Sequence, residues 1–159
     1  MEEILEVLEK NSRISAEQLA IMLNKSVEEV KEAIRKLEEE KVILGYATLI
    51  NWEKTNKESV VALIEVKVTP QRGEGFDKVA ERIYGYAEVK SCYLMSGGFD
   101  LTVIVEGNNM KEVALFVAEK LAPLESVLST ATHFVLKKYK DNGVDFEEKT
   151  KDDREVIIL

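Results

Sequence analysis

Residues 15–46 read S-A-E-Q-L-A-I-M-L-N-K-S-V-E-E-V-K-E-A-I-R-K-L-E-E-E-K-V-I-L-G-Y and predict two short helices separated by a tight turn. Ser15 precedes Gln18 by three residues, and Ser26 precedes Glu29 by three. Each pair is typical of a capping box, in which two side chains satisfy unpaired backbone N–H groups at a helix start. Two helix starts so close together predict a helix-turn-helix unit.

Apolar residues on either side of the turn predict how this unit packs. Asn24 is of a residue type that readily adopts the left-handed conformation that ends a helix, and small Ala20 is where we expect the two helices to approach. Residues 2–11 have apolar residues at helical spacing and predict an earlier helix beneath the other two. The three helices would share one small core.

The second helix of the pair, from Ser26 to Glu40, has an apolar stripe and a charged face. Arg35 or Lys31 could donate to guanine, and Lys25 could hold a phosphate. Glu28 or Glu32 could accept from cytosine N4. A mixed-charge face is also typical of a helix that only meets solvent. The candidate DNA-binding residues are Lys25, Ser26, Glu28, Lys31, Glu32, Arg35 and Lys36.

Composition and charge bound the function. With 159 residues, of which 45% are hydrophobic and 33% charged, the chain is typical of one or two soluble globular domains. The net charge is −8 and the isoelectric point about 4.9, whereas a basic patch is the usual footprint of nucleic-acid binding. Residues 1–44 have seven basic and eleven acidic residues. For DNA binding, local geometry and several linked binding units would have to compensate for this negative charge.

Several classes of protein are disfavoured. No run of 18 apolar residues and no basic-then-apolar start is present, so we expect no membrane span, no secretory signal and a cytoplasmic location. The single Cys92 excludes an internal disulfide, and with the single His133 it supplies neither a metal site nor a catalytic triad. We therefore expect no enzyme, no metal and no cofactor. Cys92 is typical of a small buried hydrophobe, and His133 of a packed strand residue more than of a pH sensor.

The chain changes character after the third helix. Gly45 predicts a bend, and residues 47–50 alternate in the manner of a strand. Residues 51–58 are polar apart from Trp52, which could anchor them. We therefore predict a helix-turn-helix domain over 1–46 and a linker over 47–58.

Residues 59–138 predict a second domain. Their order of strand, helix, strand, strand, helix, strand is that of a ferredoxin-like βαββαβ sheet with both helices on one face, so the chain is of the α+β class. Because residues 60–64 are apolar on both faces, we expect the uncovered face to meet a second copy in a homodimer. The predicted elements are strand 59–69, helix 76–85, strand 87–95, turn 96–98, strand 99–105, a helix from Asn108 or Asn109 through Leu121, and strand 127–138.

Residues 139–159 form a charged C-terminal tail. Residues 141–143 predict a turn, and apolar residues 156–159 predict a strand that docks on an open sheet edge.

The chain resembles the Lrp/AsnC, or feast/famine, family of transcription factors over residues 2–138. The resemblance lies in R-I-S-A-E-Q-L-A (13–20), in S-V-E-E-V-K-E-A-I-R-K-L-E-E-E-K-V-I-L-G-Y (26–46) and in S-G-G-F-D (96–100), which is similar to the family's G-x-[FY]-D turn. It implies an amino-acid-responsive protein that binds double-stranded DNA, built from dimers that can assemble into octamers or rings. It also implies that the effector binds between neighbouring dimers, near that turn and the fourth strand.

An effector site near the turn has the chemistry that an α-amino acid requires. Asp100 could accept from an ammonium group, while backbone N–H groups at Gly97 and Gly98 and threonine hydroxyls could bind a carboxylate. Period-two alternation places Asp100 with Thr102 on one face of the third strand and Thr130 with Thr132 on one face of the fourth, so these side chains could form a polar cluster. Gly-Gly is also an ordinary hairpin turn, and Thr is a favoured strand residue. The candidate effector residues are Ser96, Gly97, Gly98, Phe99, Asp100, Thr130 and Thr132.

Two functions remain open from the sequence. The first is a sequence-specific transcriptional regulator whose DNA binding or assembly responds to an amino acid or a related metabolite. The second is an amino-acid-binding oligomeric sensor that has little DNA affinity and acts through protein contacts, which the acidic first domain favours.

Overall fold

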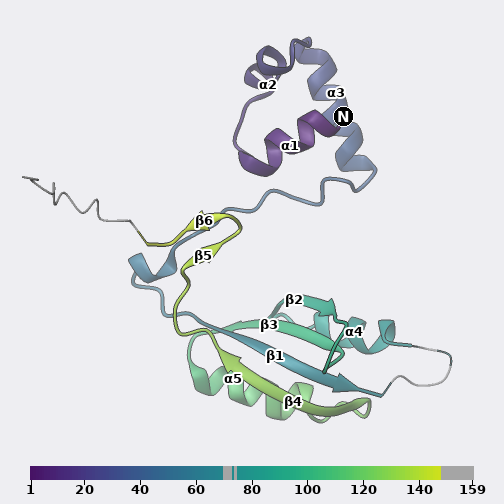
Figure 1. The fold of residues 1–159 in the computed structure, drawn as a ribbon, viewed down its shortest axis with the longest axis vertical. Coiled ribbons are helices and arrows are strands. Elements are labelled where there is room, and N and C mark those ends of the chain that lie inside the picture. The colour runs from purple at the N-terminus through teal and green to yellow at the C-terminus, as the bar shows by residue number, and fades with distance from the viewer. Residues whose placement is uncertain (70–72, 74, 148–159) are drawn as a thin grey trace, which may run out of the picture. The chain divides into compact units, whose positions relative to one another are not determined.

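A computed structural model describes residues 1–69, 73 and 75–147 and divides the chain into two compact units (Figure 1). The first is Met1–Ile50, and the second begins at Asn51. We call them the head and the sheet domain. Each has its own hydrophobic core.

The head contains α1 (Glu2–Lys10), α2 (Ala16–Leu23) and α3 (Val27–Glu39). Both predicted capping boxes are confirmed: Ser15 Oγ accepts from Gln18 N at 3.2 Å, and Ser26 Oγ accepts from Glu29 N at 3.2 Å. In each box the second side chain accepts from the backbone N–H of the serine. The predicted left-handed residue is also confirmed, since Asn24 has φ 51° and ends α2.

The core of the head comes from all three helices. Ala20 is buried where the turn closes, and its carbonyl accepts from Lys25 N at 2.9 Å. The side of α3 opposite its charged face therefore packs into this apolar core. The buried residues are Ile4, Leu8, Leu19, Ala20, Val30 and Leu37.

The chain leaves the head differently from the prediction. Lys41, with φ 59°, rather than Gly45 has the left-handed conformation after α3. Residues 44–51 form neither helix nor strand, so the strand predicted at 47–50 is wrong for the isolated chain. The alternating pattern is present, but a strand needs a hydrogen-bonding neighbour, and these residues are exposed.

The sheet domain has the predicted ferredoxin-like order and confirms the α+β class. Its strands pair antiparallel in the order β2-β3-β1-β4. A π-helical turn, Val117–Leu121, extends α5. The elements are β1 (Val60–Val68), α4 (Asp77–Tyr84), β2 (Val89–Leu94), β3 (Leu101–Gly107), α5 (Met110–Phe116) and β4 (Val127–Phe134).

Strand register decides which side chains face the two helices. Ile64 on β1 pairs with Val103 on β3 and with Thr132 on β4, and directly paired residues point to the same side of a sheet. Ile64 and Val103 are fully buried in the same core as Ile83 of α4 and Phe116 of α5. One face is therefore covered by both helices.

The opposite face has no covering element among the described residues of the sheet domain. Leu63 on β1 pairs with Ile104 on β3 and with His133 on β4, and these residues are half-buried or exposed. Along the middle strands this open face has an apolar part around Leu63 and Ile104, with Glu65 and Thr102 beside it.

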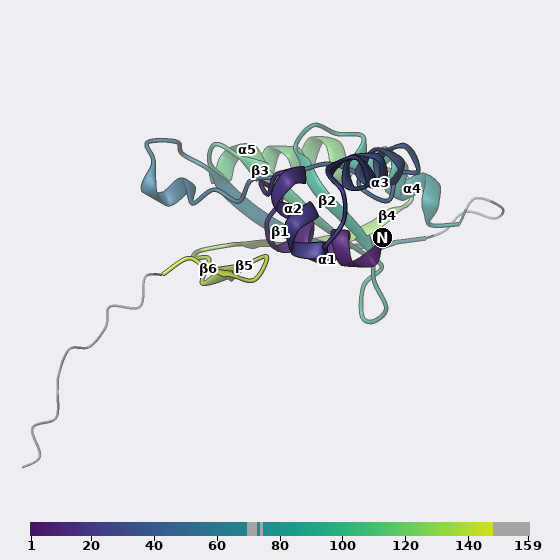
Figure 2. The ribbon, with the colours of Figure 1, turned by 90° about the horizontal axis from the view of Figure 1, so that it is seen from above.

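Residues 52–54 and 135–147 complete the described chain (Figure 2). Trp52–Lys54 forms a short 3-10 helix inside the predicted linker. β4 ends at Phe134, four residues before the predicted end, and a hairpin of β5 (Lys140–Asp141) and β6 (Val144–Asp145) follows it. The predicted turn at 141–143 is confirmed, with positive φ at Asn142 and Gly143. The strand predicted at 156–159 lies outside the described residues.

Candidate DNA-binding face and effector site

The solvent face of α3 presents every predicted DNA-contacting residue. Val30 and Leu37 point into the core, which fixes how the helix is rotated. We refer to the opposite side, together with the turn before it, as the α3 face. Its exposed residues are Lys25, Ser26, Glu28, Lys31, Glu32, Arg35 and Lys36.

Arg35 is held by carboxylates of its own helix. Its Nε donates to Glu32 Oε2 at 3.0 Å, and its Nη2 donates to Glu32 Oε1 at 2.5 Å. Its Nη1 also donates to Glu39. These bonds raise the pKa of the Arg35 guanidinium, and the hydrogen bond and charge of Arg35 lower the pKa of Glu32. The guanidinium is therefore oriented along the helix before any DNA arrives.

The other two basic residues of α3 also have carboxylate partners. Lys31 Nζ lies 3.4 Å from Glu17 of α2, and Lys36 Nζ lies 3.7 Å from Glu40. The pKa of Glu17 is lowered by its backbone hydrogen bond, by Ser15 and by Lys31. These carboxylate partners were not predicted from the sequence. The i,i+3 and i,i+4 spacings of the pairs within α3 could have shown them, whereas the contact between α2 and α3 depends on packing.

The turn before α3 differs from the rest of the α3 face. Lys25 and Glu28 have no ion pair or hydrogen-bonded side-chain partner in the part of the chain that the structure describes. The Ser26 hydroxyl oxygen accepts from Glu29 N, so Ser26 has a structural role as the N-cap. Lys25 and Glu28, at the start of α3, could therefore contact DNA without first giving up a partner within the head.

The predicted effector turn is a six-residue connection, Met95–Asp100, between β2 and β3. Ser96, Gly97 and Gly98 are exposed, and Phe99 and Asp100 are half-buried. Gly97 has φ +143°, a backbone conformation that residues other than glycine rarely adopt. The connection is longer than the three-residue turn predicted at 96–98, and β3 begins two residues later than predicted.

Asp100 ties this connection to β1. Its Oδ2 accepts from Val68 N at 2.8 Å, its N donates to the Val66 carbonyl at 3.1 Å, and its carbonyl accepts from Met95 N at 2.8 Å. One carboxylate oxygen accepts one of these three bonds, and the other has no hydrogen bond within the described residues. The side chain therefore has both a structural bond and a remaining acceptor.

The register separates the threonines that were predicted to cluster. Thr130 and Thr132 on β4 pair with Val66 and Ile64, on the helix-covered face. Thr102 pairs with Glu65, whose side chain is on the open face. Sequence alternation gave the face within each strand, but only register relates one strand to another. A cluster that unites Thr102 with Thr130 and Thr132 does not form within one chain.

Thr130 shares one end of the sheet with the Met95–Asp100 connection. Val66 pairs with Thr130 on one side and with Leu101, the neighbour of Asp100, on the other. Since β1 lies between β3 and β4, Thr130 and Leu101 are separated by two strand spacings, about 10 Å. A ligand as small as an amino acid would need further groups to contact both.

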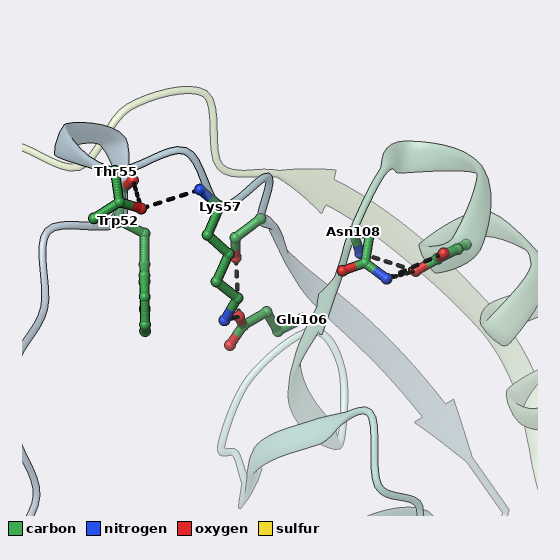
Figure 3. A network of polar contacts seen from close by, with 7 residues as sticks. Trp52, Thr55, Lys57, Glu106 and Asn108 are labelled. Carbon is green, nitrogen blue, oxygen red and sulfur yellow. Dashed lines mark hydrogen bonds and ion pairs between the residues drawn. The ribbon is translucent and has the colours of Figure 1, made fainter.

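The segment before β1 is tied to the sheet by a polar network (Figure 3). Lys57 Nζ lies 4.1 Å from the centre of the Trp52 ring and 3.2 Å from Glu106 Oε1. Ser59 Oγ donates to the same carboxylate at 2.9 Å. Burial acts to raise the pKa of Glu106, but the bonds from Ser59 and Lys57 outweigh it and the pKa is lowered. The sequence identified Trp52 as an anchor but not its partners.

The remaining candidate groups are dispersed. Cys92 is half-buried, which raises the pKa of its thiol, and His133 Nε2 lies 3.4 Å from Glu65 Oε1 on the open face. The described ranges contain no cluster of three or more His, Cys, Asp or Glu side chains arranged to hold a metal ion. No helix in those ranges is long and apolar enough to cross a membrane.

Comparisons with known proteins match both units. Residues 2–43 match a family described as winged helix-turn-helix DNA-binding, and residues 61–145 match the Lrp/AsnC ligand binding domain. The chain is 55% identical over 156 residues to the uncharacterized HTH-type transcriptional regulator YugG of Bacillus subtilis, covering 98% of this chain and 94% of that one. It is 27% identical to the proline dehydrogenase transcriptional activator of Rhizobium radiobacter, covering 89% and 90%.

A solved structure agrees over the same length. The complex of a transcriptional regulator from Neisseria meningitidis with L-methionine aligns with a TM-score of 0.71 and 25% identity, over 87% of this chain and 89% of that one. The similarity covers both the head and the sheet domain.

Proposed function

Because the chain belongs to the Lrp/AsnC family of transcriptional regulators, we propose that it binds operator DNA through the α3 face and that an amino acid modulates this binding. The observation that carries the proposal is the pairing of a helix-turn-helix head with an Lrp/AsnC ligand binding domain in one chain. Its relatives are named as transcriptional regulators, and we assign no catalytic step to any residue.

The proposed DNA contacts begin at the turn before α3. In helix-turn-helix proteins the first residues of the second helix contact base edges in the major groove. Lys25 is exposed and unpaired within the described residues, so it is our candidate for a phosphate contact. Glu28 has an available carboxylate that can accept from cytosine N4. Arg35 can offer its Nε and Nη2 donor pair to guanine only after Glu32 leaves that pair, and Lys31 is held near Glu17.

The proposed effector is an α-amino acid. It would bind beside residues 96–100, in the connection between β2 and β3 at one end of the sheet. The unpaired carboxylate oxygen of Asp100 can accept from the ammonium group, and backbone N–H groups at Gly97 and Gly98 can donate to the carboxylate. The similar regulator from Neisseria meningitidis was crystallised with L-methionine, which makes methionine the first compound to try. Thr130, about two strand spacings away, would complete the site together with a neighbouring dimer.

The proposed assembly is a homodimer through the open face of the sheet. Val61, Leu63 and Ile104 are apolar and only partly buried in the single chain, so pairing two sheets would remove apolar surface from water. A two-fold dimer presents two heads, and it therefore fits a pseudo-palindromic operator. Further assembly to octamers would supply additional linked heads. We expect the protein to act in the cytoplasm.

A DNA titration tests this function directly. A labelled duplex spanning the promoter of the chain's own gene is titrated at several salt concentrations, with and without each of the common L-amino acids. We expect saturable binding that weakens steeply with salt and that one or a few amino acids change.

An acidic head also favours a second candidate, a sensor that acts through protein contacts. Absence of DNA binding at low salt, in a protein that still binds an amino acid by calorimetry, would contradict the regulator and support this sensor.

A further inference from the structure

The basic residues of α3 are all engaged by carboxylates of the head. Lys31 is paired with Glu17, Arg35 with Glu32 and Glu39, and Lys36 with Glu40. We propose that DNA binding by this head is an exchange, in which phosphate or base acceptors displace these carboxylates, and that Glu32 is the positioning residue that controls it. The inference rests on the proposed DNA-binding function.

Glu32 is singled out by the geometry of its contact with Arg35. A guanidinium has five N–H donors, and two that point in parallel can bind guanine, phosphate or a carboxylate as a fork. Glu32 occupies one such fork, through Nε at 3.0 Å and Nη2 at 2.5 Å. Glu39 takes a donor of Nη1. Glu32 therefore occupies the same kind of donor pair that a nucleic acid would need.

The local charge acts in the same direction as the geometry. Glu32, Arg35 and Glu39 together have a net charge of −1, so a phosphate that approaches Arg35 meets repulsion unless a carboxylate moves away. All three side chains are more than half exposed. Exposed ion pairs have small net stability, so this exchange has a modest cost and is reversible.

An exchange has a distinctive salt dependence. A protein that neutralises phosphates releases their condensed cations, which makes binding weaken as salt increases. A carboxylate that loses its Arg or Lys partner attracts a cation in return, which offsets part of that release. Binding by this head should therefore depend on salt less steeply than its number of phosphate contacts implies.

The variant Glu32→Gln tests the proposal because Gln has nearly the same shape as Glu and no charge. With the full-length protein and the promoter duplex, we expect binding about five-fold tighter, which corresponds to one exposed ion pair. We also expect the slope of log affinity against log salt to steepen by up to about one. Far-UV circular dichroism should be unchanged, since Glu32 is exposed.

A matched control separates this effect from the loss of one negative charge. Glu6 of α1 is exposed and has no ion pair or hydrogen-bonded side-chain partner in the described ranges, so Glu6→Gln makes the same change of net charge elsewhere in the head. We expect Glu32→Gln to exceed Glu6→Gln in both affinity and slope. In an Arg35→Ala background the two variants should have equal effects.

The outcomes are distinct. Equal effects of Glu32→Gln and Glu6→Gln in the wild-type background overturn the exchange. Weaker binding by Glu32→Gln also overturns it, because Glu32 would then support Arg35 in a base contact. If Arg35→Ala binds DNA like the wild type, the exchange fails together with the assignment of Arg35 to the DNA-binding surface. If only Arg35→Ala changes binding, the exchange alone fails.

Discussion

The head and the sheet domain assemble their candidate sites in different ways. In the head, the candidate residues lie on one helix and the turn before it, so a single helical rotation, fixed by Val30 and Leu37, places them all. In the sheet domain, the candidates come from the connection before β3 and from β4, and β1 lies between β3 and β4. A site of local residues follows from periodicity, whereas a site built across strands also depends on register and on other subunits.

The largest expected effects come from the separate hydrophobic cores of the head and the sheet domain. Leu37→Ala in the head and Ile64→Ala in the sheet domain each truncate a buried side chain, and each should cost about 2–5 kcal/mol in its own unit. Leu37→Ala should abolish DNA binding and leave amino-acid binding intact. Urea denaturation checks whether each loss of stability is confined to its own unit, because Trp52, the only tryptophan, reports on the sheet domain by fluorescence. A shift of the Trp52 transition by Leu37→Ala would show that the two cores are coupled.

The DNA-binding surface of the head is tested by single basic residues. Lys25→Ala should weaken promoter binding by about ten-fold and reduce the salt slope by about one, because one phosphate contact is lost. Lys111→Ala, at an exposed lysine of α5 in the sheet domain, is the matched control. Equal losses from the two variants would mean that general charge, and not the α3 face, determines binding.

The effector site is tested at Asp100 by two substitutions. Asp100→Asn keeps an oxygen that can accept from Val68 N but removes the charge, so it should weaken effector binding by about ten-fold with little change in stability. Asp100→Ala removes both and should also destabilise the connection. Calorimetric titration with the active amino acid measures the first effect, and thermal unfolding measures the second. Wild-type effector affinity in Asp100→Asn would remove the carboxylate from the site.

The helix caps give a smaller effect that is confined to the head. Ser26→Ala removes the hydroxyl that accepts from Glu29 N and should destabilise the head by about 1 kcal/mol. Ser12→Ala, in the turn before α2, should be near neutral. The helical circular dichroism signal in urea measures both, and equal midpoints would contradict the capping role.

The smallest expected effect is a pH dependence in the sheet domain. Because the pKa of Glu106 is lowered in the folded state, its bonds with Ser59 and Lys57 stabilise the fold above the unfolded pKa of about 4.3 and are lost as pH falls through the folded pKa. Glu106→Gln should lower the free energy of unfolding by about 1 kcal/mol at neutral pH and leave it unchanged once Glu106 is protonated. Unfolding at pH 7 and pH 3 checks the sign, and an equal cost at both would contradict it.

Local chemistry explains which features were predictable from the sequence. The capping boxes at Ser15 and Ser26 and the left-handed Asn24 follow from a few neighbouring residues, and the strand–helix order follows from periodicity. The strand expected at 47–50 has the right pattern but no hydrogen-bonding neighbour in the described chain. The expected threonine cluster failed because residue alternation does not give strand register.

The partners of the basic residues on α3 divide in the same way. The pairing of Arg35 with Glu32 and Glu39 was readable from helical spacing, whereas the contact between Lys31 and Glu17 required the packing of α2 against α3. Residues 96–100 were located from the sequence, but the bond from Val68 N to Asp100 was not, because it joins residues far apart in the chain.

Coupling between the DNA-binding face and the effector site is the most direct test of the proposed regulation. Calorimetry would measure the affinity of the wild-type protein for its active amino acid, with and without saturating promoter DNA. We expect DNA to change this affinity by the same factor by which the amino acid changes DNA affinity, since coupling between two binding equilibria is reciprocal. An amino-acid affinity that is identical with and without DNA would contradict regulation through the sheet domain.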